Sequence, residues 1–221
     1  MTATLDAIVA PLRKSPLYAE IADLLHAELT AERALRQKFY AEITPEQKVE
    51  FIGGEIIMHS PARNLHLDIT LNASQLLATF VRRHQLGEVK VEKCLLAFPR
   101  NDYEPDLVFF GLEKAKTLQP GTMRFPCPDL IIEVLSPSTE DRDRGIKFED
   151  YAAHGVSEYW IIDPDQQIIE QYLLQNSTYR LTTKSSTGLI HSTAIPGFTA
   201  PIPAFFHLNE NLAALKTILN H

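Results

Sequence analysis

The stretch over residues 128–163 constrains the fold more than any other part of the chain. It reads PDLIIEVLSPSTEDRDRGIKFEDYAAHGVSEYWIID. Its apolar run over residues 130–135, interrupted by one charge at Glu133, is typical of a strand covered on both faces. Ser136-Pro137 ends this strand, a polar helical segment runs up to Gly155, and residues 158–163 form a second apolar strand. This order predicts a mixed α/β fold, in which helices flank a sheet.

A carboxylate inside an apolar strand is costly unless a metal ion, a lysine or a set of hydrogen bonds satisfies it. Glu133 therefore marks a candidate site. In the following helix, Asp143, Lys147 and Tyr151 are spaced at i, i+4 and i+8, so their side chains share one face. Each also has an ordinary interpretation. Asp143 and Lys147 would form a surface ion pair worth about 0.3–0.5 kcal/mol, and Tyr151 would be a packing group.

The composition describes one acidic chain of moderate size. A formal net charge of −7 argues against a surface coated with positive charge for non-specific nucleic-acid binding. A local basic groove beside an acidic metal site is still compatible with that charge. The 221 residues are 45% hydrophobic, enough for one large domain with a full core. We expect a helical arm over residues 1–43, which docks or forms a dimer, and a main domain over residues 44–221.

Signals for export and for disulfide bonding are missing from the sequence. No run of about 18 apolar residues predicts a membrane span. The N-terminus MTATLDAIVAPLRKSP lacks the basic start and long apolar core of a secretory signal. Cys94 and Cys127 are too few for a disulfide framework or a zinc cluster, so we expect two buried thiols. These features predict a cytoplasmic protein.

Apolar spacing predicts the order of the remaining elements. Helical spacing of leucines indicates helices over residues 17–41 and 63–84. Gly53-Gly54 predicts a hairpin between two short strands. That hairpin carries Glu50 and Glu55, whose ordinary interpretation is solvent-facing charge, and His66 lies near the start of the second helix. The other predicted elements are strands over residues 88–98, 107–110, 168–174, 179–183 and 190–195, a loop over residues 111–127 and a helix over residues 209–219.

Acidic residues at two buried strands predict a metal site. Asp106 stands directly before the strand over residues 107–110, and Glu133 lies in the strand over residues 130–135. Two carboxylates from adjacent strands supply the oxygen ligands that Mg²⁺ prefers, and the backbone carbonyl of Val134 would complete the set. A lysine nearby would hold the attacking water and steady the charge that develops during phosphodiester cleavage. Taken alone, Pro-Asp before a strand is more often a simple turn.

Three segments resemble a known family. GGEIIMHSPARNLH, EPDLVFF and, most specifically, PDLIIEVLSPSTEDRDRGIKFEDYAAHGVSEYWIIDP are similar to the Uma-two-type restriction endonuclease family of the PD-(D/E)XK nuclease superfamily. The resemblance covers about residues 44–174. It implies a restriction-endonuclease-like fold, with a mixed central β-sheet flanked by helices, and a magnesium-dependent nuclease site.

The resemblance also assigns residues. Asp106 matches the first metal-binding acid of the superfamily, and Glu133 matches the second. The superfamily usually places its lysine two residues after the second acid, where this chain has Leu135. Lys147, on the following helix, matches the lysine of the family instead. Further polar site groups of the family fall at Glu50, Glu55 and His66.

We therefore expect a Mg²⁺-dependent endonuclease, with Mn²⁺ as a substitute ion, that hydrolyses DNA phosphodiester bonds as a homodimer. Asp106, Glu133 and Lys147 are expected to converge on one pocket. Two alternatives stay open: a catalytically inactive relative that serves as a binding or assembly module, and a nuclease that acts on RNA or structured DNA. We expect His66, or one of Glu50 and Glu55, to line the same pocket, and Asp143 and Tyr151 are candidates for further site groups.

Overall fold

The computed structural model describes residues 5–44 and 46–220. Residues 1–4 of the predicted arm and residues 45 and 221 of the predicted main domain lie outside the described residues. The helices are α1 (Leu5–Arg13), α2 (Tyr18–Glu42), α3 (Asn64–His84), α4 (Leu112–Ala115), α5 (Glu140–Arg144), α6 (Ile146–Ala153), the 3-10 helix η1 (Ile202–Phe205) and α7 (Leu208–Asn220). The strands are β1 (Val49–Ile52), β2 (Glu55–Met58), β3 (Gly87–Val91), β4 (Leu95–Ala97), β5 (Asp102–Tyr103), β6 (Leu107–Gly111), β7 (Arg124–Phe125), β8 (Leu130–Val134), β9 (Glu158–Asp163), β10 (Ile168–Gln175), β11 (Thr178–Ser185), β12 (Leu189–His191) and β13 (Thr199–Pro201).

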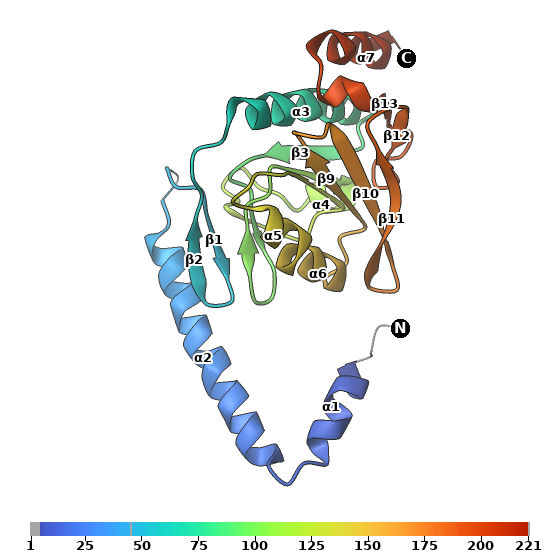
Figure 1. Ribbon diagram of the computed structural model, residues 1–221. Coiled ribbons are helices and arrows are strands. Elements are labelled where there is room, and N and C mark those ends of the chain that lie inside the picture. The colour runs from blue at the N-terminus through green and yellow to red at the C-terminus, as the bar shows by residue number, and fades with distance from the viewer. Residues whose placement is uncertain (1–4, 45, 221) are drawn as a thin grey trace.

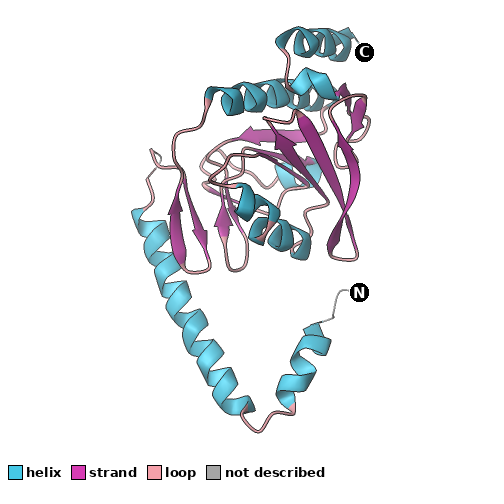
Figure 2. Cartoon of the chain, in the orientation of Figure 1, coloured by secondary structure: helices cyan, strands magenta, loops and turns pink. Residues whose placement is uncertain are grey.

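Six strands form the central sheet, in the order β11-β10-β9-β8-β6-β3. Neighbouring strands are antiparallel except β8 and β9, which run parallel and are connected through α5 and α6 (Figure 1). A second sheet has the order β2-β1-β5-β4-β7, and β12 pairs with β13. Helices flank these sheets, as Figure 2 shows. The mixed α/β fold predicted from the sequence is therefore confirmed.

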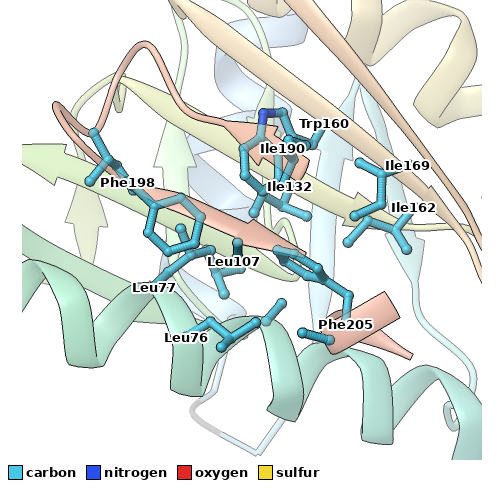
Figure 3. Close-up of a cluster of buried hydrophobic side chains, with 14 of the residues drawn as sticks. Leu76, Leu77, Leu107, Ile132, Trp160, Ile162, Ile169, Ile190, Phe198 and Phe205 are labelled. Carbon is cyan, nitrogen blue, oxygen red and sulfur yellow. The ribbon is translucent and has the colours of Figure 1, made fainter. Parts of the chain in front are cut away.

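Alternating side chains of β8 serve two separate cores. Ile132 belongs to the larger apolar cluster, together with Leu76 of α3 (Figure 3). Ile131, one position earlier, belongs to the second cluster, together with Tyr151 of α6. Successive side chains of a strand point to opposite faces, so Glu133 shares the face of Ile131. The carboxyl group of Glu133 therefore lies in the layer between the central sheet and α6.

The single helix predicted after β8 is instead broken into α5 and α6 at Gly145. This residue has φ −110° and ψ −106°, and a Cβ there would lie 2.6 Å from the carbonyl oxygen of Asp141. Because a side chain at this position would collide with the backbone, the break requires glycine. Asp143 and Lys147 stand on opposite sides of the break, yet Oδ1 and Nζ lie 3.1 Å apart. The two side chains therefore still lie on one face, as predicted.

Three other segments differ from the predictions. The strand expected over residues 88–98 is divided into β3 and β4, because Glu92 and Lys93 adopt positive φ angles of 41° and 46° and turn the chain. The loop expected over residues 111–127 contains α4 and β7, and the strand expected over residues 190–195 is replaced by the β12–β13 hairpin. A strand as short as β7 depends on its distant partner β4, which local sequence patterns do not show.

The N-terminal arm, which consists of α1 and α2, extends away from the two sheets (Figure 1). Its contact with the main body is concentrated near Phe39, the buried residue of α2, and Arg36. The guanidinium of Arg36 donates to both carboxylate oxygens of Asp102, at 2.6 and 2.8 Å. None of the described helices is long and apolar enough to cross a membrane. The homodimer stays a prediction. Several large apolar side chains of α2 are exposed, namely Tyr18, Leu24, Leu25, Leu29 and Leu35.

We expect Arg36→Ala to loosen α2 from the body. The substitution removes the cation that faces the fully buried carboxylate of Asp102, at a cost of about 1–3 kcal/mol in unfolding free energy. Urea unfolding and the rate of limited proteolysis within α2 measure the effect. Arg33→Ala is the matched control, because Arg33 is exposed on the same helix. Equal proteolysis of both variants would show that the Arg36 anchor does not hold the arm.

Candidate active site

A cavity of about 750 Å³ lies between the β1–β2 hairpin, the start of α3 and the loop after β8. Asp106, Glu133 and Lys147, the three residues predicted to converge, all contribute to its lining. His66 lines the same cavity from the first turns of α3, and Val134 does so from the end of β8. The structure thus brings the principal candidate residues to one place, although their catalytic roles stay predictions.

Lys147 is the centre of a buried cluster of carboxyl groups. Its Nζ lies 3.0 Å from Oε1 of Glu50, 3.0 Å from Oε1 of Glu133 and 3.1 Å from Oδ1 of Asp143. The Tyr151 hydroxyl donates to the same Oε1 of Glu133 at 3.0 Å. Lys147 is 1% exposed and Asp143 is equally buried, so their interpretation as a surface ion pair is wrong. Asp143 and Tyr151 contact Lys147 and Glu133 but do not line the cavity themselves, so their role as further site groups stays a prediction.

One ammonium group faces three carboxyl groups in this cluster, so ionisation of all three would leave buried negative charge in excess. Burial raises the pKa of Glu50, but the charge of Lys147 and the contact with His59 outweigh it and lower the pKa to about 2. Burial raises the pKa of Glu133 to about 8, because Lys147 offsets it only in part and the charges of Asp143 and other carboxyl groups add to the rise. Proton binding is therefore favoured at Glu133 and disfavoured at Glu50.

Asp106 has different partners. Nζ of Lys48 lies 3.1 Å and Nε2 of His66 lies 3.2 Å from its Oδ1, while the backbone N–H of Val134 donates to its Oδ2 at 2.9 Å. Burial alone would raise the pKa of Asp106, but the contact with His66 and the charge of Lys48 hold that pKa well below its usual range. The bond from Val134 also ties the start of β6 to the end of β8, beside Glu133.

The β1–β2 hairpin brings one of its two candidate carboxylates to the site. Glu50 is buried and paired with Lys147, so its interpretation as solvent-facing charge is wrong. Glu55 is exposed, and neither glutamate lines the cavity itself, so of the three candidates Glu50, Glu55 and His66 it is His66 that does. The cavity lies at the open end of the hairpin, near His59, whereas Glu55 follows the Gly53-Gly54 turn at the other end.

Three polar side chains of the site were not predicted. Lys48 pairs with Asp106, and Nε2 of His59 lies 3.2 Å from Oε2 of Glu50. Glu104 accepts a hydrogen bond from a backbone N–H of β1, and burial raises the pKa of its carboxyl group to about 7. Lys48 could have been found from the period of two residues along β1, which puts its side chain on the same face as Glu50.

Comparison with protein families relates this site to known proteins. Residues 33–203 match the Uma2 family model, which is described as "Putative restriction endonuclease". The chain belongs to the Uma2 family. The resemblance inferred from the sequence is thereby confirmed, and the match includes every residue of the cavity described above.

Two relatives extend this comparison. The uncharacterized protein sll1609 of Synechocystis sp. (strain ATCC 27184 / PCC 6803 / Kazusa) is 32% identical over 147 residues, which make up 65% of this Uma2 chain and 80% of sll1609. A crystal structure from Anabaena variabilis ATCC 29413, described as "a putative nuclease belonging to DUF820", superposes with a TM-score of 0.67 at 21% identity. The match covers 81% of this chain and 97% of the other, and it shows that the two proteins share a fold.

The donor set of this Uma2 site suits a hard divalent cation. Asp106, Glu133 and the carbonyl of Val134 offer oxygen atoms, the ligands of Mg²⁺. Oε1 of Glu133 takes the bonds from Lys147 and Tyr151, whereas Oε2 accepts none from a described residue. Within residues 5–44 and 46–220, no three His, Cys, Asp or Glu side chains form a ready cluster for a metal. Mg²⁺ keeps several waters and needs few carboxylates, so this set still fits it.

Proposed function

We propose that this Uma2 protein is a divalent-metal-dependent endonuclease that hydrolyses phosphodiester bonds of DNA. The observation that carries the proposal is the meeting of Asp106 and Glu133, from adjacent strands, with Lys147 in one cavity. Membership of a family of restriction-endonuclease type supports nuclease activity. A bound Mg²⁺, or Mn²⁺ in its place, would polarise the phosphate and lower the pKa of a bound water.

The chain's own residues would hold and orient the reacting groups. In this proposal Asp106 and Glu133 bind the cation, together with the carbonyl of Val134. Lys48 and His66 fix the orientation of the Asp106 carboxylate and keep it ionised. Preorganised donors of this kind need no rearrangement when charge develops in the transition state.

Lys147 has two tasks in the proposed site. It fixes the Glu133 carboxyl group through a contact of 3.0 Å, and it offsets the charge of that group once the proton leaves. It also steadies the negative charge that develops as the phosphodiester is attacked. Tyr151 supports the first task, because its hydroxyl donates to the same oxygen of Glu133.

We expect the apparent affinity for Mg²⁺ to rise about tenfold per pH unit between about pH 6 and pH 8. Because the pKa of Glu133 is raised to about 8 in the metal-free protein, the cation must displace a proton below that pH. Above about pH 8 the proton no longer competes, so the affinity should level off. Isothermal titration calorimetry measures both the affinity and the protons released. A wild-type affinity that does not change with pH would contradict Glu133 as a ligand.

Cleavage of a mixed panel of DNA and RNA, with Mg²⁺, Mn²⁺ or a chelator, tests the proposed function. We expect cleavage of DNA with either metal and none with the chelator. Cleavage of RNA alone would favour the alternative nuclease. If the wild type cleaves no nucleic acid at all, the protein is an inactive relative.

One observation favours the inactive alternative as a second candidate function. Leu135 stands where the superfamily usually carries its lysine, and Lys147 is 1% exposed and paired with three carboxyl groups. A binding module that kept this cavity would hold nucleic acid equally well with and without metal. Binding measured in chelator and in Ca²⁺ separates such a module from the proposed enzyme.

A further inference from the structure

Arg142 of α5 is a basic group of the cavity that the proposed metal chemistry does not use. It follows Glu133 by nine residues and lines the same cavity. Among the described residues it forms no ion pair, and its Nε is buried without a hydrogen-bond partner. A buried donor without a partner is unfavourable unless water or a ligand satisfies it. Arg142 is therefore poised to receive an acceptor from outside the chain.

Arg144, two residues further along α5, is used differently. It pairs with Glu140 at 2.9 Å and with Glu170 at 2.7 Å, on the side of strand β10. Side chains two residues apart point about 200° apart around a helix, so Arg142 is directed away from those carboxylates. The short helix thus carries one arginine that stabilises the fold and one that lines the cavity.

The turn before α5 adds hydroxyl groups to the same wall. Ser136, Ser138 and Thr139 all line the cavity. Oγ of Ser136 lies 3.1 Å from Oγ of Ser138 and 3.0 Å from Oγ1 of Thr139. Hydroxyl groups and arginine are common partners of nucleic-acid phosphates, and the planar fork of a guanidinium matches two phosphate oxygens at once. This combination is suited to a phosphate monoanion within a polynucleotide.

The partners of the cavity's cations distinguish Arg142 from Lys48 and Lys147. Near Asp106 and Glu133, the cations Lys48 and Lys147 are already paired with carboxyl groups. An anion finds no unpaired cation in Lys48 or Lys147, whereas Arg142 has no ion-pair partner among the described residues and attracts it. Arg142 is therefore free to take a phosphate other than the one that the proposed cation holds.

We propose that Arg142, with the hydroxyl groups of residues 136–139, binds a non-scissile phosphate of the substrate. The inference rests on the proposed nuclease function and adds a contact with a second phosphodiester of the same polynucleotide. Arg142 is a positioning residue in this scheme, because it acts by placing the neighbouring phosphodiester beside Asp106 and Glu133. Its loss should raise KM and leave kcat unchanged.

Steady-state kinetics on two substrates test this inference. One substrate is the DNA oligonucleotide that the wild type cleaves best, and the other is bis(p-nitrophenyl) phosphate, a diester with no second phosphate. Arg142→Gln should raise KM for the oligonucleotide about tenfold, and should lower the salt dependence of oligonucleotide binding by about one phosphate contact. Hydrolysis of the small diester should not change. Arg142→Lys, which keeps the charge without the fork, should recover part of the lost KM.

Arg83→Gln is the control. It removes the same charge from the exposed last turn of α3, about 25 Å along that helix from His66. Its kinetics should match those of the wild type on both substrates. Equal losses on both substrates in Arg142→Gln, or an oligonucleotide KM equal to that of the control, would overturn the inference while the nuclease function stands. If the wild type neither binds nor cleaves the oligonucleotide, the nuclease function itself is overturned.

Discussion

Glu133→Gln should abolish cleavage of nucleic acid and preserve the fold. The amide keeps the shape of the side chain and an oxygen that can accept from Lys147 and Tyr151. It lacks the charge that would hold the cation, so we expect the cleavage rate in Mg²⁺ to fall roughly a thousandfold or more. Initial rates on the DNA that the wild type cleaves best measure this effect.

Glu55→Gln provides the matched control for that experiment. It makes the same chemical change at an exposed position outside the cavity, so it should cleave at the wild-type rate. Circular dichroism should show folded protein for both variants. If Glu133→Gln retained half of the wild-type rate, Glu133 would be excluded as a ligand of the catalytic cation.

The same substitution should change the pH dependence of stability in the absence of metal. The pKa of Glu133 is raised from 4.5 to about 8, so the native state holds a proton that the unfolded chain releases at lower pH. The unfolding free energy of the wild type therefore falls as pH rises from about 4.5 to about 8. Glu133→Gln lacks this contribution and should be the steadier protein at pH 8 in chelator.

Lys147→Met should destabilise the fold strongly. Lys147 is the ammonium group that faces Glu50, Glu133 and Asp143 in a buried cluster, and its pKa is raised well above the usual range by these charges despite burial. Removing one partner of a buried ionic cluster costs about 3–5 kcal/mol in unfolding free energy. For a chain of this size that is roughly 6–20 °C in melting temperature.

The loss in Lys147→Met should also depend on pH. Lys147 is charged at all pH values below the ordinary pKa of lysine. Its stabilising effect, however, requires ionised carboxyl groups beside it. The difference in unfolding free energy between wild type and variant should therefore be larger at pH 8 than at pH 5. Urea unfolding at both pH values measures it.

Two further variants test whether the loss of stability comes from the buried cluster or from the removal of any lysine. Lys38→Met makes the same change on the exposed surface of α2, where the pair with Glu42 has an N–O distance of 3.8 Å, and should change stability little. Glu133→Gln in the Lys147→Met background should recover part of the loss, because it removes one of the unpaired carboxyl groups. Equal losses from both lysine substitutions would contradict the central position of Lys147.

Local sequence patterns predicted those parts of the site whose residues are close in sequence. An unpaired charge in an apolar strand pointed to Glu133, and helical spacing joined Asp143, Lys147 and Tyr151. That common face persists through the break at Gly145, because the two short helices remain in contact. In such segments, the apolar run and the spacing of residues along the strand or helix together predict which side chains lie near one another.

The rest of the site arises from contacts between distant segments. Glu50 is buried because the hairpin packs near Lys147, far along the chain, and a hairpin pattern alone does not reveal this. Lys48 and His59 reach the cavity because β1 and β2 are paired in one register, and β5 pairs with β1 beside them. Glu55 lies away from the cavity for the same reason, since the location of the cavity along the hairpin depends on α3 and β8.

The shift in melting temperature that Mg²⁺ causes tests the metal site most directly, because it requires no knowledge of the substrate. Thermal melts of the wild type and of Glu133→Gln are compared in Mg²⁺ and in chelator, at pH 8 and at pH 5. Free Mg²⁺ at 100 times Kd adds about 2.7 kcal/mol, or roughly 5–10 °C for a chain of this length. We expect that rise in the wild type at pH 8, a smaller rise at pH 5, and none in Glu133→Gln. An equal rise in both proteins, or none in the wild type, would contradict the metal site and the nuclease mechanism that depends on it.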